Sequence, residues 1–192
     1  MYVIFFGPPG VGKGTQALVI AGRFGWAHIS TGDMFRQHVK DRTELGVKVK
    51  GIMDQGQLVP DALVIGMFMD RLASLGEGQG FVLDGFPRTL VQAQALDAAL
   101  GTKGKAIDMA VHITAPDAVL LDRMMGRAKE SGRSDDTPEA MRTRLQVMKP
   151  APDLLGHYRM AGKLKEIDGT PDVETVTAAV IEALGLAGPG KR

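Results

Sequence analysis

The glycine-rich segment at residues 7–15, Gly-Pro-Pro-Gly-Val-Gly-Lys-Gly-Thr, has the composition of a phosphate-binding loop. Its glycines allow successive backbone N–H groups to turn inward, and the N-terminus of a following helix adds positive potential. Lys13 supplies a mobile positive charge that can follow the β- and γ-phosphates of a nucleotide. An apolar run before the segment and a helical pattern after it provide the required context. The residues expected to contact phosphate are Gly10, Val11, Gly12, Lys13, Gly14 and Thr15.

This segment departs from the strict loop pattern at one position. The strict pattern places Ser or Thr directly after the lysine, with its hydroxyl on magnesium. Here Gly14 intervenes and the hydroxyl follows at Thr15, so we do not assign Thr15 as a direct magnesium ligand. An ordinary glycine-rich turn between a strand and a helix is the alternative interpretation, and the spacing and context favour phosphate binding.

Arginines and carboxylates recur in five further segments that could handle phosphate. Arginine suits this chemistry because its planar guanidinium makes two hydrogen bonds and stays charged. Asp84 ends an apolar run, where a carboxylate can orient water around magnesium, although it could simply form the turn before Gly85. Arg123 and Arg127 share one helix face, which could equally be solvated. The segments cover residues 30–36, 57–61, 84–92, 122–127 and 133–144.

The elements that must position these residues follow from hydrophobic patterning. Short apolar runs predict strands at residues 2–6, 27–29, 81–83, 110–113 and 164–167. Helical spacing predicts helices at residues 13–24, from near Met34, and at 60–75, 89–100, 117–130, 137–148 and 172–184. This alternation is typical of α/β proteins, and we expect a three-layer fold of the P-loop NTPase type with a central five-stranded parallel sheet. Ligands of such folds bind beyond the carboxyl ends of the strands.

Composition excludes several other classes of protein. Lys plus Arg total 23 against 22 Asp plus Glu, and a net charge of +1 does not indicate nucleic-acid binding. The absence of cysteine excludes disulfide scaffolds and cysteine-ligated zinc. The apolar runs are far shorter than the roughly 18 residues that cross a bilayer, and the N-terminus lacks the layout of a secretory signal. We expect a cytoplasmic protein without membrane or nucleic-acid partners, and a monomer by default.

In their order along the chain, these segments resemble the motifs of the nucleoside monophosphate kinases, and most closely those of the adenylate kinase family. The likeness covers essentially the whole chain, and residues 84–92 are its most specific part. It implies transfer of the terminal phosphoryl group of ATP to AMP, giving two ADP, so that ATP, AMP and ADP are the expected partners. Mg²⁺ would arrive with ATP, largely water-ligated, and Asp84 would act on it through water.

The same resemblance implies roles for individual residues. The catalytic set would be Lys13, Asp84, Arg88, Arg123, Arg127, Arg133 and Arg144. The ATP site would add Arg123, Arg127 and Pro171 to the glycine-rich loop, with Pro171 standing where long-lid relatives often have lysine. The AMP site would comprise Thr31, Gly32, Arg36, Gln57, Leu58, Val59, Gly85, Phe86, Pro87, Arg88, Gln92, Arg133 and Arg144. Asp33 would either lie near the phosphates or cap a helix, and Thr31 is the other candidate for the capping residue.

Two residues bear on the choice of acceptor base. Adenine-selective members of the family have Thr and Gln where this chain has Thr31 and Gln92, whereas pyrimidine-selective relatives tend to have Ala and Asn. A glutamine amide offers one donor and one acceptor, which match the N1/N6 edge of adenine. We expect AMP as acceptor, unless Gln92 simply faces solvent. A UMP/CMP kinase is the alternative, and a non-catalytic nucleotide sensor is disfavoured because the arginines are present.

The resemblance also divides the chain into a core and two closing segments. Residues 30–59 would form the domain that binds the monophosphate, residues 126–136 a short lid, and residues 1–29, 60–125 and 137–192 the core. Five residues separate Arg127 from Arg133, so the inserted hairpin of longer members is missing and no zinc is expected. Closure over the core would exclude water, which competes as phosphoryl acceptor.

Overall fold

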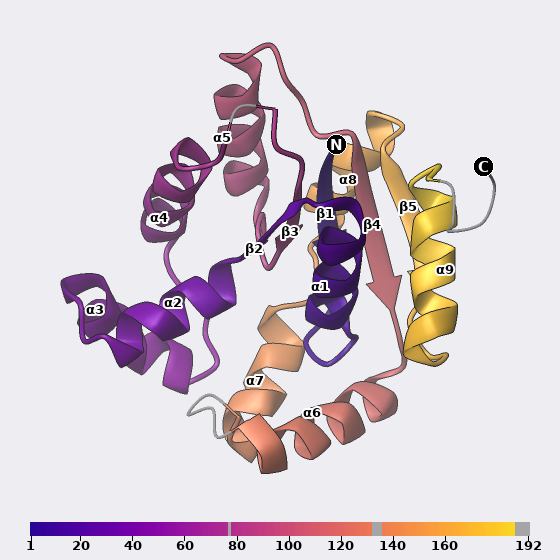
Figure 1. The fold of residues 1–192 in the computed structure, drawn as a ribbon. Coiled ribbons are helices and arrows are strands. Elements are labelled where there is room, and N and C mark those ends of the chain that lie inside the picture. Colours follow the sequence, from indigo (N-terminus) through magenta and orange to yellow (C-terminus); the bar gives the residue numbers. More distant parts are fainter. Residues whose placement is uncertain (77, 132–135, 187–192) are drawn as a thin grey trace.

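The computed structural model describes residues 1–76, 78–131 and 136–186 and contains a five-stranded parallel sheet (Figure 1). The strands are β1 (Tyr2–Phe6), β2 (Ala27–Ser30), β3 (Phe81–Asp84), β4 (Met109–Thr114) and β5 (Leu164–Asp168). Their order across the sheet is β2-β3-β1-β4-β5, and every pairing is parallel. The α/β fold class predicted from the sequence is confirmed.

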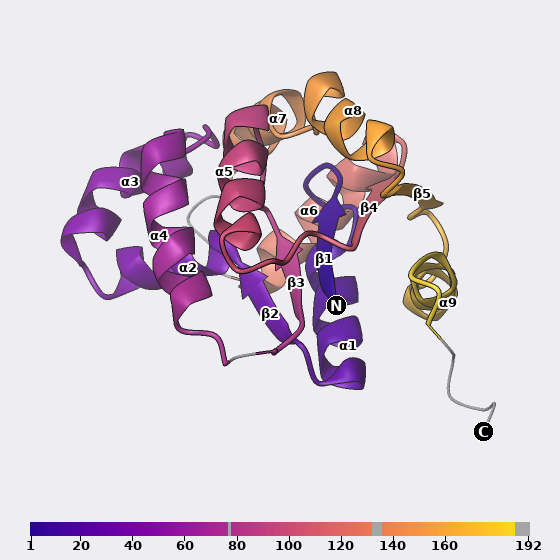
Figure 2. The ribbon, with the colours of Figure 1, turned by 90° about the horizontal axis from the view of Figure 1, so that it is seen from above.

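Helices cover both faces of this sheet (Figure 2). Helices α1 and α9 pack on one face and α4, α5 and α8 on the other. Helices α2 and α3 extend beyond the β2 edge, while α6 and α7 lie past the carboxyl ends of the strands (Figure 1). The helices of the described residues are α1 (Lys13–Phe24), α2 (Thr31–Lys40), α3 (Glu44–Asp54), α4 (Asp61–Ala73), α5 (Leu90–Gly101), α6 (Asp117–Ser131), α7 (Pro138–Val147), α8 (Pro152–Met160) and α9 (Val173–Ala183). Within the described ranges, no helix is both long and apolar enough to span a membrane.

Strand β1 anchors the glycine-rich loop in the middle of the core. Val3 and Phe5 belong to the apolar layer beneath α1 and α9, whereas Ile4 and Phe6 belong to the layer beneath α4, α5 and α8. All four side chains are buried. A strand that is buried on both faces needs a continuous apolar run rather than alternation. The loop after Phe6 therefore starts from a strand whose last four side chains are all buried.

Helix α2 begins at Thr31, earlier than the predicted start near Met34. The cause is Ser30, whose Oγ accepts a hydrogen bond from the backbone N–H of Asp33 at 3.3 Å and thus caps the helix. Neither Thr31 nor Asp33 is the capping residue, so that part of the prediction is wrong. Asp33 takes part in the cap only through its backbone.

Helices α3 and α8 were not predicted from the sequence. Gly46 lies inside α3 and Gly156 inside α8, and a glycine in a helix interior lowers helix propensity by about 1 kcal/mol relative to alanine. Tertiary packing compensates, because Val49 and Leu154 are completely buried. Gly46 is also a close-approach position: a Cβ there would lie 2.0 Å from the carbonyl oxygen of His38 on α2.

Candidate active site

The glycine-rich loop lines a cleft at the carboxyl end of β1, and all six residues predicted to contact phosphate lie on its wall. Gly12 is the N-cap of α1 with a φ of 98°, in the left-handed region, and no side chain among the described residues caps this helix terminus by a hydrogen bond. Its uncapped N–H groups and its dipole favour an anion. A Cβ on Gly10 would lie 2.7 Å from the carbonyl oxygen of Leu120, so glycine allows the loop to pack closely on α6.

Lys13 opens α1 at the floor of the cleft. Its Nζ donates a hydrogen bond of 2.8 Å to the carbonyl oxygen of Pro8, so the side chain folds back over its own loop. The pKa of the ammonium group is lowered to about 8, chiefly by desolvation; Asp84 acts in the opposite direction, and the arginines of the cleft contribute to the lowering. Asp84 offsets part of the positive charge around Lys13, and an anion bound in this cleft would offset the rest.

Asp84 reaches the loop because of the sheet register, which pairs Phe5 of β1 with Asp84 at the end of β3. A Cβ on Gly14 would lie 3.3 Å from Oδ2 of Asp84, so the absence of a side chain at Gly14 keeps the space between loop and carboxylate open. His28 of β2 is the neighbour on the other side, with Nε2 4.0 Å from the same Oδ2. This buried nitrogen makes no hydrogen bond with any residue that the structure describes. Sequence reasoning missed His28, because the four histidines match no metal spacing.

Arg88 and Thr31 are tied to one backbone carbonyl. Nε of Arg88 and Oγ1 of Thr31 each donate to the carbonyl oxygen of Gly85 at 2.9 Å. Desolvation lowers the pKa of the Arg88 guanidinium to about 10, and Arg144 and Arg36 act in the same direction, while Asp84 opposes them. Arg88 therefore remains charged at neutral pH, and its orientation is set by the turn that follows β3.

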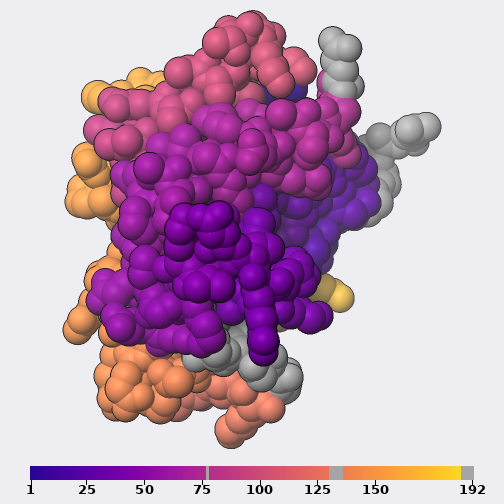
Figure 3. Space-filling view, turned by 90° about the vertical axis from the view of Figure 1, so that its left-hand side faces the viewer, coloured from indigo at the N-terminus to yellow at the C-terminus, as the bar shows by residue number. Residues whose placement is uncertain are grey.

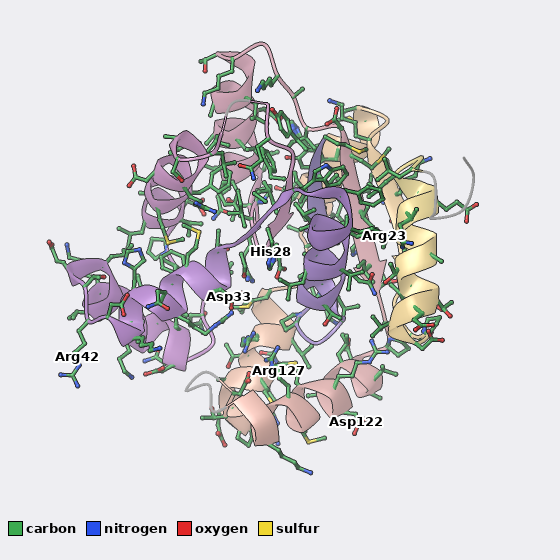
Figure 4. All side chains as sticks on the ribbon, in the orientation of Figure 1. Arg23, His28, Asp33, Arg42, Asp122 and Arg127 are labelled. Atoms are coloured by element: carbon green, nitrogen blue, oxygen red, sulfur yellow. The ribbon has the colours of Figure 1, made fainter. Side chains whose placement is uncertain are left out.

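Arg36 projects from α2 toward the same cleft. Its Nη2 lies 2.5 Å from Oδ1 of Asp33, one turn earlier on the helix. Figure 4 shows Asp33, His28 and Arg127 around the space between α1, α2 and α7. In contrast, Arg42 and Asp122 point outward there, and both are exposed. Four arginines that match none of the motifs in the sequence are also exposed, namely Arg23, Arg42, Arg71 and Arg159.

A second, smaller pocket opens off the cleft beside α2 and α3. Phe35 and Val64 form apolar walls, and Gln92 lies among them with only 2% of its surface exposed. The alternative in which Gln92 faces solvent is therefore wrong. Ten of the residues predicted for the AMP site line this pocket, namely Thr31, Gly32, Arg36, Gln57, Leu58, Val59, Gly85, Arg88, Gln92 and Arg144.

The other residues of that predicted set lie elsewhere. Phe86 is buried and stacks on Phe68 at a ring-centroid distance of 4.1 Å, so it supports the turn from behind. Pro87 is buried beside a small pocket that also touches Lys13 and Arg88. Arg133 lies outside the described residues.

Arginines from α6 and α7 converge on one carboxylate at the far wall of the cleft. Arg127 donates to both oxygens of Asp136, through Nη2 at 2.5 Å and Nε at 3.1 Å, and Nη1 of Arg144 donates to the same group at 3.0 Å. The side chain of Asp136 is 1% exposed, against 30% for Arg127. The sequence assigned no role to Asp136, although an aspartate just before the α7 cap in an arginine-rich segment was a usable signal.

Arg123 is held by the loop after β5. Its Nη1 donates to the carbonyl oxygen of Gly169 at 2.7 Å and its Nη2 to that of Thr170 at 3.0 Å. Pro171 follows directly and lines the cleft beside Arg123. The guanidinium therefore lies between the loop after β5 and the glycine-rich loop, where a nucleotide phosphate or base would pass.

The charges on the cleft wall are predominantly positive. Lys13, Arg36, Arg88, Arg123, Arg127 and Arg144 line it together. The carboxylates among its lining residues are Asp33, Asp84 and Asp172. An excess of guanidinium groups in a partly desolvated cleft suits ligands that carry several phosphates.

Comparison with known proteins agrees with this chemistry. A family model described as adenylate kinase matches residues 5–163. The chain is similar to an adenylate kinase of Rhizobium meliloti, with 46% identity over 192 aligned residues that cover 96% of this chain and 100% of the relative. It is 45% identical to an adenylate kinase of Phenylobacterium zucineum over 185 residues, which cover 96% and 97% of the two chains. An adenylate kinase of Lachnospira eligens is 42% identical over 213 aligned residues, which cover 96% of this chain and all of the relative. The resemblance noted in the sequence is thus confirmed, and this phosphotransferase belongs to the adenylate kinase family.

Proposed function

We propose that this enzyme transfers the terminal phosphoryl group of ATP to AMP in the cleft described above, giving two ADP. The observation that carries the proposal is the junction between the two pockets. The large cleft at the glycine-rich loop and the smaller pocket beside α2 share Arg36, Arg88 and Arg144 on their walls. A donor phosphate chain in one and an acceptor phosphate in the other would meet at these guanidinium groups.

On the donor side, the triphosphate would lie over the loop and the N-terminus of α1. Lys13 would leave the carbonyl of Pro8 and follow the transferring phosphoryl group, since that hydrogen bond of 2.8 Å is easily exchanged for a charged partner. Arg123 and the backbone beside Pro171 would contact the ATP base and phosphates, and Arg127 the phosphates. These groups position charge and need form no covalent bond to the substrate.

On the acceptor side, Arg36 and Arg88 would hold the AMP phosphate and the smaller pocket its base. Phe35 and Val64 supply apolar surface for a purine ring, and Gln92 supplies the polar edge. The Nε of Arg88 is already bound to the carbonyl oxygen of Gly85, so the guanidinium is oriented before substrate arrives. Such preorganisation lowers the entropy lost on binding. Arg144 would close over the transferring group, together with Arg133.

Mg²⁺ is the metal that this reaction class uses, and the residues at the loop fit it. The carboxylate of Asp84 faces the loop across the space that Gly14 leaves open, and an oxygen ligand of this kind suits Mg²⁺. Within the described ranges, at the loop as elsewhere, no group of three or more His, Cys, Asp or Glu side chains could hold a metal, and Mg²⁺ would therefore rely on ATP and water for most of its ligands. Mg²⁺ bound with ATP would neutralise charge that develops on the phosphates, and Asp84 would orient its water ligands.

Closure of two segments over the core would complete the site. We assign residues 30–59 as the monophosphate-binding domain, 126–136 as a short lid, and 1–29, 60–125 and 137–192 as the core. In the side view of Figure 3 the purple surface of the segment that contains α2 and α3 adjoins the orange surface of α7. At this contact a Cβ on Gly56 would lie 2.5 Å from the carbonyl oxygen of Ala140. The alignment with the Lachnospira eligens kinase is longer than this chain, so that relative contains residues that the present chain lacks.

We further propose that the enzyme acts in the cytoplasm as a monomer and maintains the balance of adenine nucleotides. A chain without cysteine is compatible with a reducing compartment.

A comparison of acceptors tests the proposed function. ADP formation would be followed by a coupled assay with ATP and Mg²⁺ and with AMP, UMP or CMP as acceptor. We expect fast turnover with AMP and slow turnover with both pyrimidine nucleotides. A preference for UMP or CMP would contradict the assignment of the base pocket, and the absence of transfer to any acceptor would contradict the proposed reaction.

A further inference from the structure

Asp61 is half-buried behind the base pocket, and its carboxylate makes a set of hydrogen bonds that the proposed reaction does not use. It is the first residue of α4, and its carboxylate accepts from Nε2 of Gln92 at 2.7 Å through Oδ1. Its Oδ2 accepts from the hydroxyl of Thr89 at 3.1 Å. That hydroxyl in turn accepts from the backbone N–H of Gln92 at 3.2 Å and caps α5. The carboxylate is thus held in place by α5 itself.

The oxygen atom of the Gln92 amide is bound by a backbone group. The N–H of Arg88 donates to Oε1 of Gln92 at 2.8 Å. A backbone N–H can only donate and a carboxylate can only accept, so the two neighbours demand the same orientation of the amide. In the reversed orientation the Gln92 oxygen would face a carboxylate, and its amino group would face another N–H. Both contacts are repulsive, and Gln92 is buried with only 2% of its surface exposed, so solvent water does not compensate for them.

These neighbours engage one hydrogen and one oxygen lone pair of the amide. A glutamine amide has two hydrogens and two lone pairs, so one donor and one acceptor remain for a ligand. In this orientation, Nε2 can donate to the N1 of adenine while Oε1 accepts from its 6-amino group. Hypoxanthine presents the opposite pattern at the same edge, with an N1–H donor and an O6 acceptor, and would require the reversed amide.

We propose that Asp61 is a specificity-determining positioning residue, which holds the Gln92 amide in the orientation that reads adenine and rejects 6-oxopurines. The inference rests on the proposed function, because it takes the pocket beside α2 as the acceptor base site. It adds a residue that touches no substrate and acts through Gln92. Recognition of the base is then set by a carboxylate on α4, a helix that lies behind the pocket.

The test compares two acceptors of nearly equal shape, AMP and IMP. For each variant we would measure the KM of AMP and the inhibition constant of IMP against AMP, with ATP and Mg²⁺ saturating. Their ratio does not depend on the folded fraction of the sample, so a destabilised variant remains informative. Asp61→Ala should reduce the discrimination between AMP and IMP at least tenfold, which corresponds to about 1.4 kcal/mol. Asp61→Asn, whose own amide can present either atom, should lose discrimination to a smaller extent.

Two controls separate positioning from a general structural effect. Asp97→Ala removes a different carboxylate, which belongs to α5 itself and accepts from Nε2 of His157 at 2.6 Å. This variant should leave the ratio of the AMP and IMP constants unchanged within about twofold. In a Gln92→Ala background, Asp61→Ala should cause no further loss of discrimination, because the group it orients is gone. The inference would be overturned if Asp61→Ala left the ratio of the AMP and IMP constants unchanged, or if it caused the same loss of discrimination with and without the Gln92 side chain. In either case, AMP turnover by the parent enzyme would still uphold the proposed function. A parent enzyme that does not phosphorylate AMP would overturn both.

Discussion

The two walls of the cleft hold their positive charges in different ways. On the core wall, Lys13 and Arg88 are bound to backbone carbonyls of the loop and turn that follow β1 and β3. On the opposite wall, Arg127 and Arg144 are bound to a side chain, the carboxylate of Asp136. A cation bound to the backbone of a buried strand end moves only with the sheet. A cation bound to a carboxylate between two surface helices can exchange that partner for a phosphate. We infer that the core wall defines where transfer occurs, and that the opposite wall, formed by α6 and α7 and called the lid wall below, governs when transfer can occur.

Removal of charge from the core wall should have the largest effect. Lys13→Met would lower kcat/KM for ATP, with Mg²⁺ and saturating AMP, by about a thousandfold, because the lost interaction is strongest with the developing transition-state charge. Steady-state kinetics would measure this. Lys165→Met removes an exposed lysine of β5 and should change kcat/KM less than twofold. A loss below tenfold in Lys13→Met would contradict the role of the core wall.

On the lid wall, Asp136→Ala should reduce both stability and activity. It leaves Arg144, whose side chain is 10% exposed, without this partner, and we expect a loss of about 2–3 kcal/mol in the free energy of unfolding. The catalytic loss should be smaller than for Lys13→Met, about tenfold to a hundredfold in kcat/KM.

Urea unfolding and steady-state kinetics on the same preparation would measure both effects of Asp136→Ala. Arg159→Ala breaks an exposed ion pair with Glu166 and serves as the control, with little change in either quantity. A larger catalytic loss in Asp136→Ala than in Lys13→Met would reverse the proposed division between the two walls.

The pH dependence of nucleotide binding should reveal the desolvated lysine of the core wall. Because the pKa of Lys13 is lowered to about 8, its charge is lost as the pH rises through 8, and ATP affinity should fall about tenfold between pH 7 and 9. Calorimetric titration would measure this, and Lys13→Met should flatten the profile. For folding the sign is opposite: burial of the charged group disfavours the folded state below pH 8, and this penalty disappears between pH 8 and the unperturbed pKa of 10.5. An affinity that is constant to pH 9 would contradict the assignment.

The smallest effect is expected when the space between the glycine-rich loop and the carboxylate of Asp84 is filled. Gly14→Ala would place a methyl group 3.3 Å from Oδ2 of Asp84, and we expect a three- to tenfold loss in kcat/KM, about 1 kcal/mol, without loss of stability. Gly22→Ala is the matched control on the same helix, since its Cβ meets nothing within 4 Å. That change should raise stability by up to about 1 kcal/mol and leave activity unchanged. Equal activity of the two variants would show that the space is not used.

The sequence predicted the core wall far better than the lid wall. A buried strand, a glycine-rich loop and a helix are recognisable because each obeys a local rule, and the observed start of α1 at Lys13 agrees with the predicted helix. The contact of Asp136 with two arginines depends on how α6 and α7 pack, which no local pattern specifies. The proximity of His28 to Asp84 follows only from the order of β2 and β3 in the sheet. The resemblance implied the role of Gln92, but the two groups that orient its amide come from separate elements, the turn after β3 and helix α4.

The most direct test of phosphoryl transfer to AMP is to measure ADP formation from ATP and Mg²⁺ with and without AMP, and to count the ADP formed per AMP consumed. We predict two ADP per AMP, and at least a hundredfold lower rate when AMP is omitted, because closure excludes water from the transferring group. Equal rates with and without AMP would show that water is the acceptor and would contradict the two-pocket account of this cleft.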